Sequence, residues 1–287
     1  MSHVRTLTMT VTEDTLQLDT PLAVRIYAAA PVRFDTPLVL HLHGGSFVYG
    51  SLDAGHTVST LLAEAGAVVV SADYPLAPGT AFPKTLQILT KALNMLAQKR
   101  GKWAGKKSPL FVAGEEAGGN LAAALALIAR DQRTPVLAGQ ILLSPMVDPS
   151  LATRSIREAE AGPVGCQWAD GWHQYLGTAD QACHPYAAPL GSSRLGGLAP
   201  ALIVTAEDDP MRDESVAYAE RLRASGVSVR HQVLPAPTGW PCALVDPDYS
   251  DGPVEGWTTK LREAFAQFLA GTASFLCPPP ATHPIRA

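Results

Sequence analysis

The stretch that most constrains the fold is a run of small residues between two apolar segments. Residues 111–120 read Phe-Val-Ala-Gly-Glu-Glu-Ala-Gly-Gly-Asn, and alanine and leucine dominate residues 121–129. This order predicts a buried strand, a sharp turn and a helix, because a backbone can reverse this tightly only where side chains are small. A G-x-S-x-G turn of this kind exposes a nucleophilic serine at the carboxyl edge of a sheet. Here the exposed position holds Glu116.

Strand and helix patterns alternate on both sides of this turn. Apolar strand segments lie at residues 37–43, 67–72, 109–113, 137–143 and 201–205, and helical patterns at 54–66, 83–100, 212–225 and 254–269. Strands that alternate with long helices predict a mostly parallel sheet with helices on both faces. Further strand patterns at 4–12, 20–28 and 227–234 bring the sheet to about eight strands.

We expect a single domain over residues 1–287, since no internal repeat or long linker divides the chain. Residues 150–190 interrupt the alternation and predict a small cap over the sheet edge. Helically spaced aromatic side chains there should pack within the cap, because buried aromatics outnumber exposed ones; they are Trp168, Trp172 and Tyr175. The proline-rich end, about residues 276–287, predicts a mobile tail.

Charge and cysteine usage exclude several classes of function. The net charge is −4 and evenly spread, which argues against nucleic acid or an anionic membrane surface as a partner. The basic run at residues 99–102 reads as a solvated helix end. The longest apolar runs are about half the roughly 20 residues that span a bilayer, and residues 1–10 lack the apolar core of a signal peptide. Four cysteines without zinc-ligand spacing predict no metal site. We therefore expect a cytoplasmic protein with reduced thiols and no cofactor.

Four motifs follow one another in the chain: His-Gly-Gly-Ser-Phe at 43–47, Asp-Tyr-Pro-Leu-Ala-Pro at 73–78, the turn at 114–120, and Asp-Pro-Met-Arg-Asp-Glu at 209–214. With these motifs in this order, the chain resembles the hormone-sensitive-lipase-like family of α/β-hydrolases, which includes bacterial esterases and relatives of arylacetamide deacetylase. The likeness extends over roughly residues 35 to 270. It implies the α/β-hydrolase fold, with a cap reduced at its N-terminal side.

The resemblance also implies a role for individual positions. Backbone N–H groups of the family's oxyanion hole match Gly44, Gly45 and Ala117, while Ser46 replaces a third glycine. The positions of the family's Ser-Asp-His triad match Glu116, Asp209 and Thr238. Two of the three catalytic residue types are therefore changed, and only the acid is retained.

No other residue replaces the lost groups in the sequence. No second serine lies in a G-x-S-x-G turn, His231 lies within a strand pattern where it reads as structural, and His43 reads as a residue that fixes the glycine-rich loop. Losing the serine or the histidine of such a triad costs about 10⁶ in kcat. From a typical kcat of about 10 s⁻¹, roughly 10⁻⁵ s⁻¹ remains, so ordinary ester hydrolysis is excluded.

Three readings of function stay open. In the first, the protein is non-catalytic, binds a small molecule or a protein partner, and the Glu116 carboxylate folds into the oxyanion hole to accept the N–H groups of Gly45 and Ala117. In the second, Glu116 is a general base that abstracts a proton next to a carbonyl, as in a lyase, dehydratase, isomerase or cyclase. The third is residual hydrolysis through a recruited group or a metal held by the acidic cluster. A small-molecule ligand is the partner class we expect, and a homodimer is compatible with the sequence. A filled site would favour the first reading.

Overall fold

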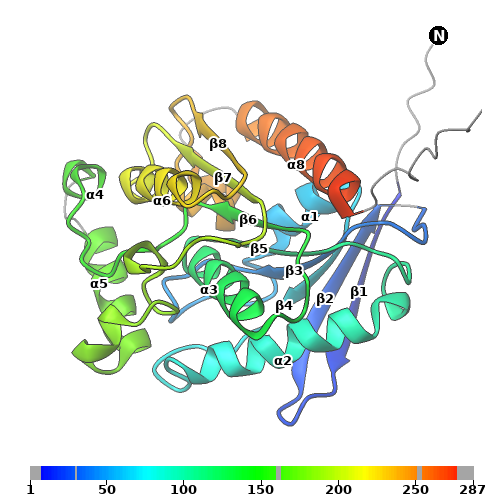
Figure 1. Cartoon of the computed structure of the whole chain (residues 1–287). Coiled ribbons are helices and arrows are strands. Elements are labelled where there is room, and N and C mark those ends of the chain that lie inside the picture. The colour runs from blue at the N-terminus through cyan, green and yellow to red at the C-terminus, as the bar shows by residue number, and fades with distance from the viewer. Residues whose placement is uncertain (1–7, 30, 160–162, 251–253, 277–287) are drawn as a thin grey trace, which may run out of the picture.

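The computed structural model describes residues 8–29, 31–159, 163–250 and 254–276. Eight strands form one sheet in the order β1-β2-β4-β3-β5-β6-β7-β8 (Figure 1). The strands are β1 (Met9–Leu16), β2 (Leu22–Ala29), β3 (Leu38–Leu42), β4 (Val68–Ala72), β5 (Leu110–Glu115), β6 (Gly139–Leu143), β7 (Ala201–Ala206) and β8 (Val229–Leu234). β2 is antiparallel to both of its neighbours, and all other pairs are parallel. The predicted mostly parallel sheet of about eight strands is confirmed.

Helices cover both faces of the sheet. They are α1 (His56–Glu64), α2 (Lys84–Gln98), α3 (Ala117–Gln132), α4 (Arg154–Glu158), α5 (Pro163–Leu176), α6 (Arg212–Ala224), α7 (Cys242–Val245) and α8 (Val254–Leu276). Short 3₁₀ turns are η1 (Arg100–Lys102), η2 (Ala179–Cys183), η3 (Pro189–Gly191) and η4 (Pro247–Tyr249). One buried core joins the sheet to α2, α3, α5 and α6, and the second joins it to α1, α7 and α8.

Alternation along each strand divides the side chains between these two cores. In β3, Leu38, Leu40 and Leu42 enter the core beneath α2 and α3, whereas Val39 enters the core beneath α1 and α8. Successive side chains of a strand point to opposite faces, so an uninterrupted apolar strand has to be covered on both. This is why the apolar segments of the sequence predicted a two-sided sheet.

The two ends of the chain differ from the sequence predictions. The strand predicted at residues 4–12 is found at Met9–Leu16, where all eight residues pair with β2; residues 1–7 lie outside the described part. The last helix continues past the predicted end at 269 to Leu276, because the first proline that interrupts it is Pro278. The predicted tail beyond this helix lies outside the described residues.

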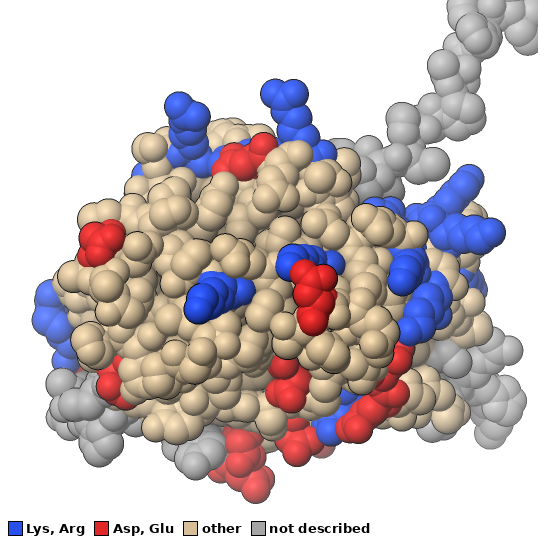
Figure 2. All heavy atoms as spheres, turned by 90° about the horizontal axis from the view of Figure 1, so that it is seen from below, with Lys and Arg blue, Asp and Glu red and all other residues tan. Residues whose placement is uncertain are grey.

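Between β6 and β7 the chain forms α4, α5, η2 and η3, which lie together beyond the carboxyl ends of the strands, on the left in Figure 1. Figure 2 views the molecule from the side that α2 covers; Lys and Arg side chains gather at the right, where α2 ends in Figure 1, and most Asp and Glu side chains of this face lie along its lower edge. Within the described ranges, no helix combines the length and the apolar character needed to cross a membrane.

Candidate active site

The turn between β5 and α3 holds Glu116 in a strained conformation at the carboxyl edge of the sheet. Its φ of 52° and ψ of −115° are rare for a residue with a side chain. Gly118 makes the turn possible, because a Cβ there would lie 1.9 Å from the carbonyl oxygen of Leu42. The side chain of Asn120 donates to the carbonyls of Met146 (2.7 Å) and Ala187 (2.9 Å) and fixes the start of α3. Glu116 thus stands where the sequence predicted a nucleophile.

The carboxylate of Glu116 lies on the glycine-rich loop and accepts four hydrogen bonds. Oε2 accepts the backbone N–H of Gly45 in a short contact and that of Ser46 at 3.0 Å. Oε1 accepts the Ser46 hydroxyl at 3.0 Å and the Trp168 indole N–H at 2.7 Å. Glu116 is only 6% exposed. A buried carboxylate with this many donors is well satisfied, and its lone pairs are occupied.

Two departures from the family pattern therefore contact one another. Glu116 lies at the position that the resemblance matches to the serine and Ser46 at the one matched to the third glycine, and Ser46 donates to Glu116 through both its backbone and its hydroxyl. The predicted donor Ala117 takes no part among the described hydrogen bonds of this carboxylate, and Ser46 replaces it. The glutamate side chain extends to the glycine-rich loop, where Gly45 and Ser46 supply its backbone donors.

The cap lies directly on this loop. A Cβ on Gly171 of α5 would come within 2.1 Å of the Ser46 carbonyl oxygen, so the helix and the loop are in backbone contact. Phe47 stacks on Tyr175, with ring centroids 4.0 Å apart, and also contacts Trp172. The aromatic side chains of α5 are buried as expected, but Trp168 does more than pack, because its N–H binds Glu116. The cap therefore covers the site in which the Glu116 carboxylate lies.

A second buried carboxylate, that of Glu115, holds the turn against the glycine-rich loop. Glu115 accepts the backbone N–H of Gly44 at 3.1 Å and lies 2.7 Å from His41 Nε2. The other ring nitrogen of His41 contacts the hydroxyls of Ser59 and Ser71. Gly44 was predicted as an oxyanion donor, yet its N–H binds Glu115. Only Gly45 of the three predicted donors faces the Glu116 carboxylate.

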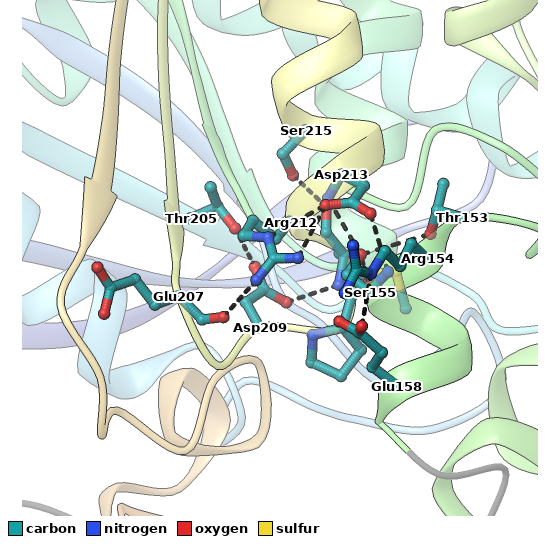
Figure 3. A network of polar contacts seen from close by, with 12 residues as sticks. Thr153, Arg154, Ser155, Glu158, Thr205, Glu207, Asp209, Arg212, Asp213 and Ser215 are labelled. Atoms are coloured by element: carbon teal, nitrogen blue, oxygen red, sulfur yellow. Dashed lines mark hydrogen bonds and ion pairs between the residues drawn. The ribbon is translucent and has the colours of Figure 1, made fainter.

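Asp209 and Thr238 follow β7 and β8 and do not pair with one another among the described hydrogen bonds. Asp209 accepts the hydroxyls of Ser144 (2.5 Å) and Thr205 and the backbone N–H of Met211 (2.8 Å). Figure 3 shows Asp209 beside Thr205. Burial raises the pKa of Asp209 to about 6.

Asp208, the neighbour of the triad acid, holds the loop that contains Thr238. It accepts the N–H (2.5 Å) and hydroxyl (2.8 Å) of Thr238 and the N–H of Gly239 (3.0 Å). These hydrogen bonds outweigh partial burial and lower the pKa of Asp208. The histidine position is thus occupied by a threonine tied to a different aspartate, which sequence reasoning missed.

Among the residues that the structure describes, no other group near the turn is set up as a nucleophile or base. His43 stacks on Tyr74 at 4.3 Å and its Nδ1 lies 2.7 Å from the Gly44 carbonyl, so it fixes the loop as predicted. His231 lies mid-strand in β8, beside the α8 side of the sheet. Partial burial and the nearby Glu116 charge raise the pKa of the Cys242 thiol, which disfavours the reactive thiolate. Within the described ranges, no group of three or more His, Cys, Asp or Glu residues could hold a metal ion.

A hollow of about 740 Å³ lies beside α5, outside the Glu116 site. Its lining is mostly apolar and includes Leu151, Ala169, Trp172, Leu176 and Leu190. Glu116, Gly45 and Thr238 are not part of that lining. The residues expected to act on a substrate therefore do not open into this hollow.

Comparison with known proteins defines the family. The sequence pattern of the alpha/beta hydrolase fold matches residues 39–238. Carboxylesterase NlhH of Mycobacterium tuberculosis is 37% identical over 216 residues, which cover 73% of this chain and 68% of the relative. The arylesterase of Saccharolobus solfataricus is 34% identical over 213 residues, 73% of this chain and 69% of the relative. The chain belongs to the hormone-sensitive-lipase-like family of α/β-hydrolases.

Solved structures of esterases agree with this hydrolase fold. A thermostable esterase from Pseudomonas putida superposes with a TM-score of 0.80 at 29% identity, over 91% of this chain and 83% of that chain. Esterase LipW from Mycobacterium marinum gives a TM-score of 0.78 at 33% identity, over 94% and 83%. The hydrolase scaffold is intact in this chain.

Proposed function

We propose that this α/β-hydrolase is a non-hydrolytic member of its family whose own glutamate occupies the oxyanion hole. The observation that carries the proposal is the set of four donors on the Glu116 carboxylate. In an acyl transfer enzyme, backbone N–H groups of such a loop stabilise the negative oxygen of a tetrahedral intermediate. Here they already bind a negative oxygen that is covalently part of the protein.

A substrate ester would have to displace this carboxylate before it could use the loop. Hydrogen bonds to a charged group contribute about 1.5–3 kcal/mol each, so displacing four of them opposes binding strongly. An ester carbonyl is neutral in the ground state and cannot replace them until charge has developed. Serine and histidine are also missing from the two positions that would generate that charge.

The same geometry argues against Glu116 as a general base. A base must present a free lone pair to a proton of the substrate within about 3 Å. Both oxygens of Glu116 face donors of the protein, and the cap covers them. The structure therefore supports the non-catalytic reading, with a small molecule or a protein as the ligand bound elsewhere.

We also propose a cytoplasmic location, because the exposed cysteines Cys183 and Cys242 are free.

Turnover of a short activated ester tests the proposal, since the named relatives are esterases. The purified protein, heat-denatured protein and the variant Glu116→Ala should show the same rate, because none of them has a nucleophile in the turn. Turnover of several per second in the native protein, retained in Glu116→Ala and lost on denaturation, would reveal a relocated nucleophile and overturn the proposal.

A further inference from the structure

The amino edge of the sheet, opposite the Glu116 site, gathers cations and exposed apolar side chains. β3, β5 and β6 are adjacent and parallel, so the loops that enter them lie side by side. The backbone confirms this: Lys107 N–H donates to the Phe34 carbonyl at 3.0 Å, and Leu38 N–H to the Pro109 carbonyl at 2.9 Å. Residues 105–107 thus meet the loop at 31–37, a few residues after the basic run 99–102 that the sequence predicted as a solvated helix end.

We call this surface the amino-edge patch and define it by two sets of residues. Its cations are Arg33, Lys99, Arg100, Lys102, Lys106 and Lys107. Its apolar members are Val32, Phe34 and Val136, which are 46%, 65% and 67% exposed. In Figure 2 the Lys and Arg side chains at the right mark the end of α2, where most of these cations lie. Four of the cations, Lys99, Arg100, Lys102 and Lys106, line a hollow of about 430 Å³.

The amino-edge patch carries a net positive charge, although the whole chain carries a net negative charge. Asp14, which binds Lys102 at 2.5 Å, and the exposed Asp35 are its acids. Arg130, which lines a hollow together with Val136, is paired with Asp131 at 2.8 Å. Six cations against two carboxylates leave a net charge of +4. Since the whole chain carries −4, the remainder carries −8. This separation of charge orients the molecule with the amino-edge patch toward any anionic surface.

We infer that the amino-edge patch binds the surface of an anionic lipid bilayer. Each Lys or Arg near such a surface contributes about 1 kcal/mol, and phosphate groups of lipids fit a hollow lined by cations. Exposed Phe and Val side chains are stabilised at the boundary of headgroups and acyl chains, whereas a nucleic-acid backbone or an acidic peptide offers them no apolar layer. The sequence argued against this partner because the cations are separated along the chain; folding brings them together. The sheet then keeps the Glu116 site on the side away from the bilayer.

Sedimentation with vesicles tests the inference on the full chain. The protein should bind vesicles of phosphatidylglycerol and phosphatidylcholine at low salt, bind phosphatidylcholine vesicles much more weakly, and be released at high salt. The variant Lys106→Gln/Lys107→Gln should weaken binding about 30-fold, and Phe34→Ser about 10-fold. Each substituted side chain is exposed, so unfolding curves of the variants should match the wild type.

Matched controls come from the opposite edge of the sheet. Tyr49→Ser removes an aromatic side chain that is 58% exposed in the glycine-rich loop, and Lys84→Gln/Arg154→Gln removes two exposed cations at the carboxyl edge; both should leave vesicle binding unchanged. Equal losses in patch and control variants, absent binding at low salt, or equal binding to neutral vesicles would overturn the inference. Tighter binding to duplex DNA or to polyglutamate than to vesicles of equal charge would assign the patch to a different partner and overturn it too. None of these outcomes bears on ester turnover, so this inference stands or fails separately from the proposed function.

Discussion

The contact between Trp168 and Glu116 gives the sharpest quantitative prediction. The indole N–H lies 2.7 Å from Oε1, and the two residues are 3% and 6% exposed. We expect Trp168→Phe and Glu116→Gln to destabilise the protein non-additively. Phenylalanine keeps most of the ring but removes the donor, and glutamine keeps the shape but removes the charge.

The magnitude follows from the burial of the pair. A hydrogen bond to a charged group contributes about 1.5–3 kcal/mol, and solvent does not screen this one. Glutamine also places an NH₂ group, which can only donate, against N–H and O–H groups that donate to the carboxylate in the wild type. Each variant loses free energy of unfolding relative to the wild type. The sum of the losses of the two single variants should therefore exceed the loss of the double variant by about 1.5–3 kcal/mol.

Denaturant unfolding of the four proteins measures this coupling energy. Trp172→Phe provides the control, because Trp172 lies on the same helix, is 2% exposed, and its N–H has no partner in the described part of the chain. Its coupling to Glu116→Gln should be close to zero. Coupling of less than about 0.5 kcal/mol for Trp168 as well would refute the reasoning that the cap is tied to the carboxylate.

Two further predictions concern the positions that the resemblance matches to the family's triad. Glu116→Ser combined with Thr238→His should yield measurable turnover of a short activated ester, while each single variant stays silent, because the triad acts as a unit; a folded but silent double variant would show that the rest of the site has diverged. Burial raises the pKa of Asp209 to about 6, so the native state holds a proton that the unfolded state releases, and stability falls as the pH rises from about 4 to 6. We therefore compare the free energy of unfolding of Asp209→Asn with that of the wild type at each pH. From pH 4 to pH 7 this difference should shift in favour of the variant by up to about 3 kcal/mol. A difference that does not change with pH would contradict a raised pKa of the buried carboxyl.

Much of the fold could be predicted because the signals are local. Apolar strand segments, the small residues around Glu116 and the four motifs each depend on neighbours in sequence, and they placed Glu116 at the correct turn. The last helix was predicted too short because its apolar periodicity did not show where it ends, and no proline between residues 269 and 276 marks the end.

The partners of the site residues could not be predicted because they come from distant segments. Trp168 donates to Glu116 across 52 positions, and Thr238 binds Asp208 across 30. The sequence did signal Ser46 as a departure from the glycine pattern, but nothing local showed that its hydroxyl faces Glu116. The sequence did not show that Asp208 rather than Asp209 would bind Thr238; in the structure the hydroxyls of Ser144 and Thr205 bind Asp209 in the core.

Acetate binding to the variant Glu116→Ala tests most directly whether the chain's own carboxylate fills its oxyanion hole. The variant removes the carboxylate but leaves the donors of Gly45, Ser46 and Trp168 in place. Acetate should then raise its melting temperature in a saturable way, as expected for a ligand that binds the native state alone, while chloride at equal ionic strength and acetamide should not. The wild type, whose site is filled, should not respond to acetate. An equal response of both proteins, or no difference between acetate and chloride in the variant, would contradict the account.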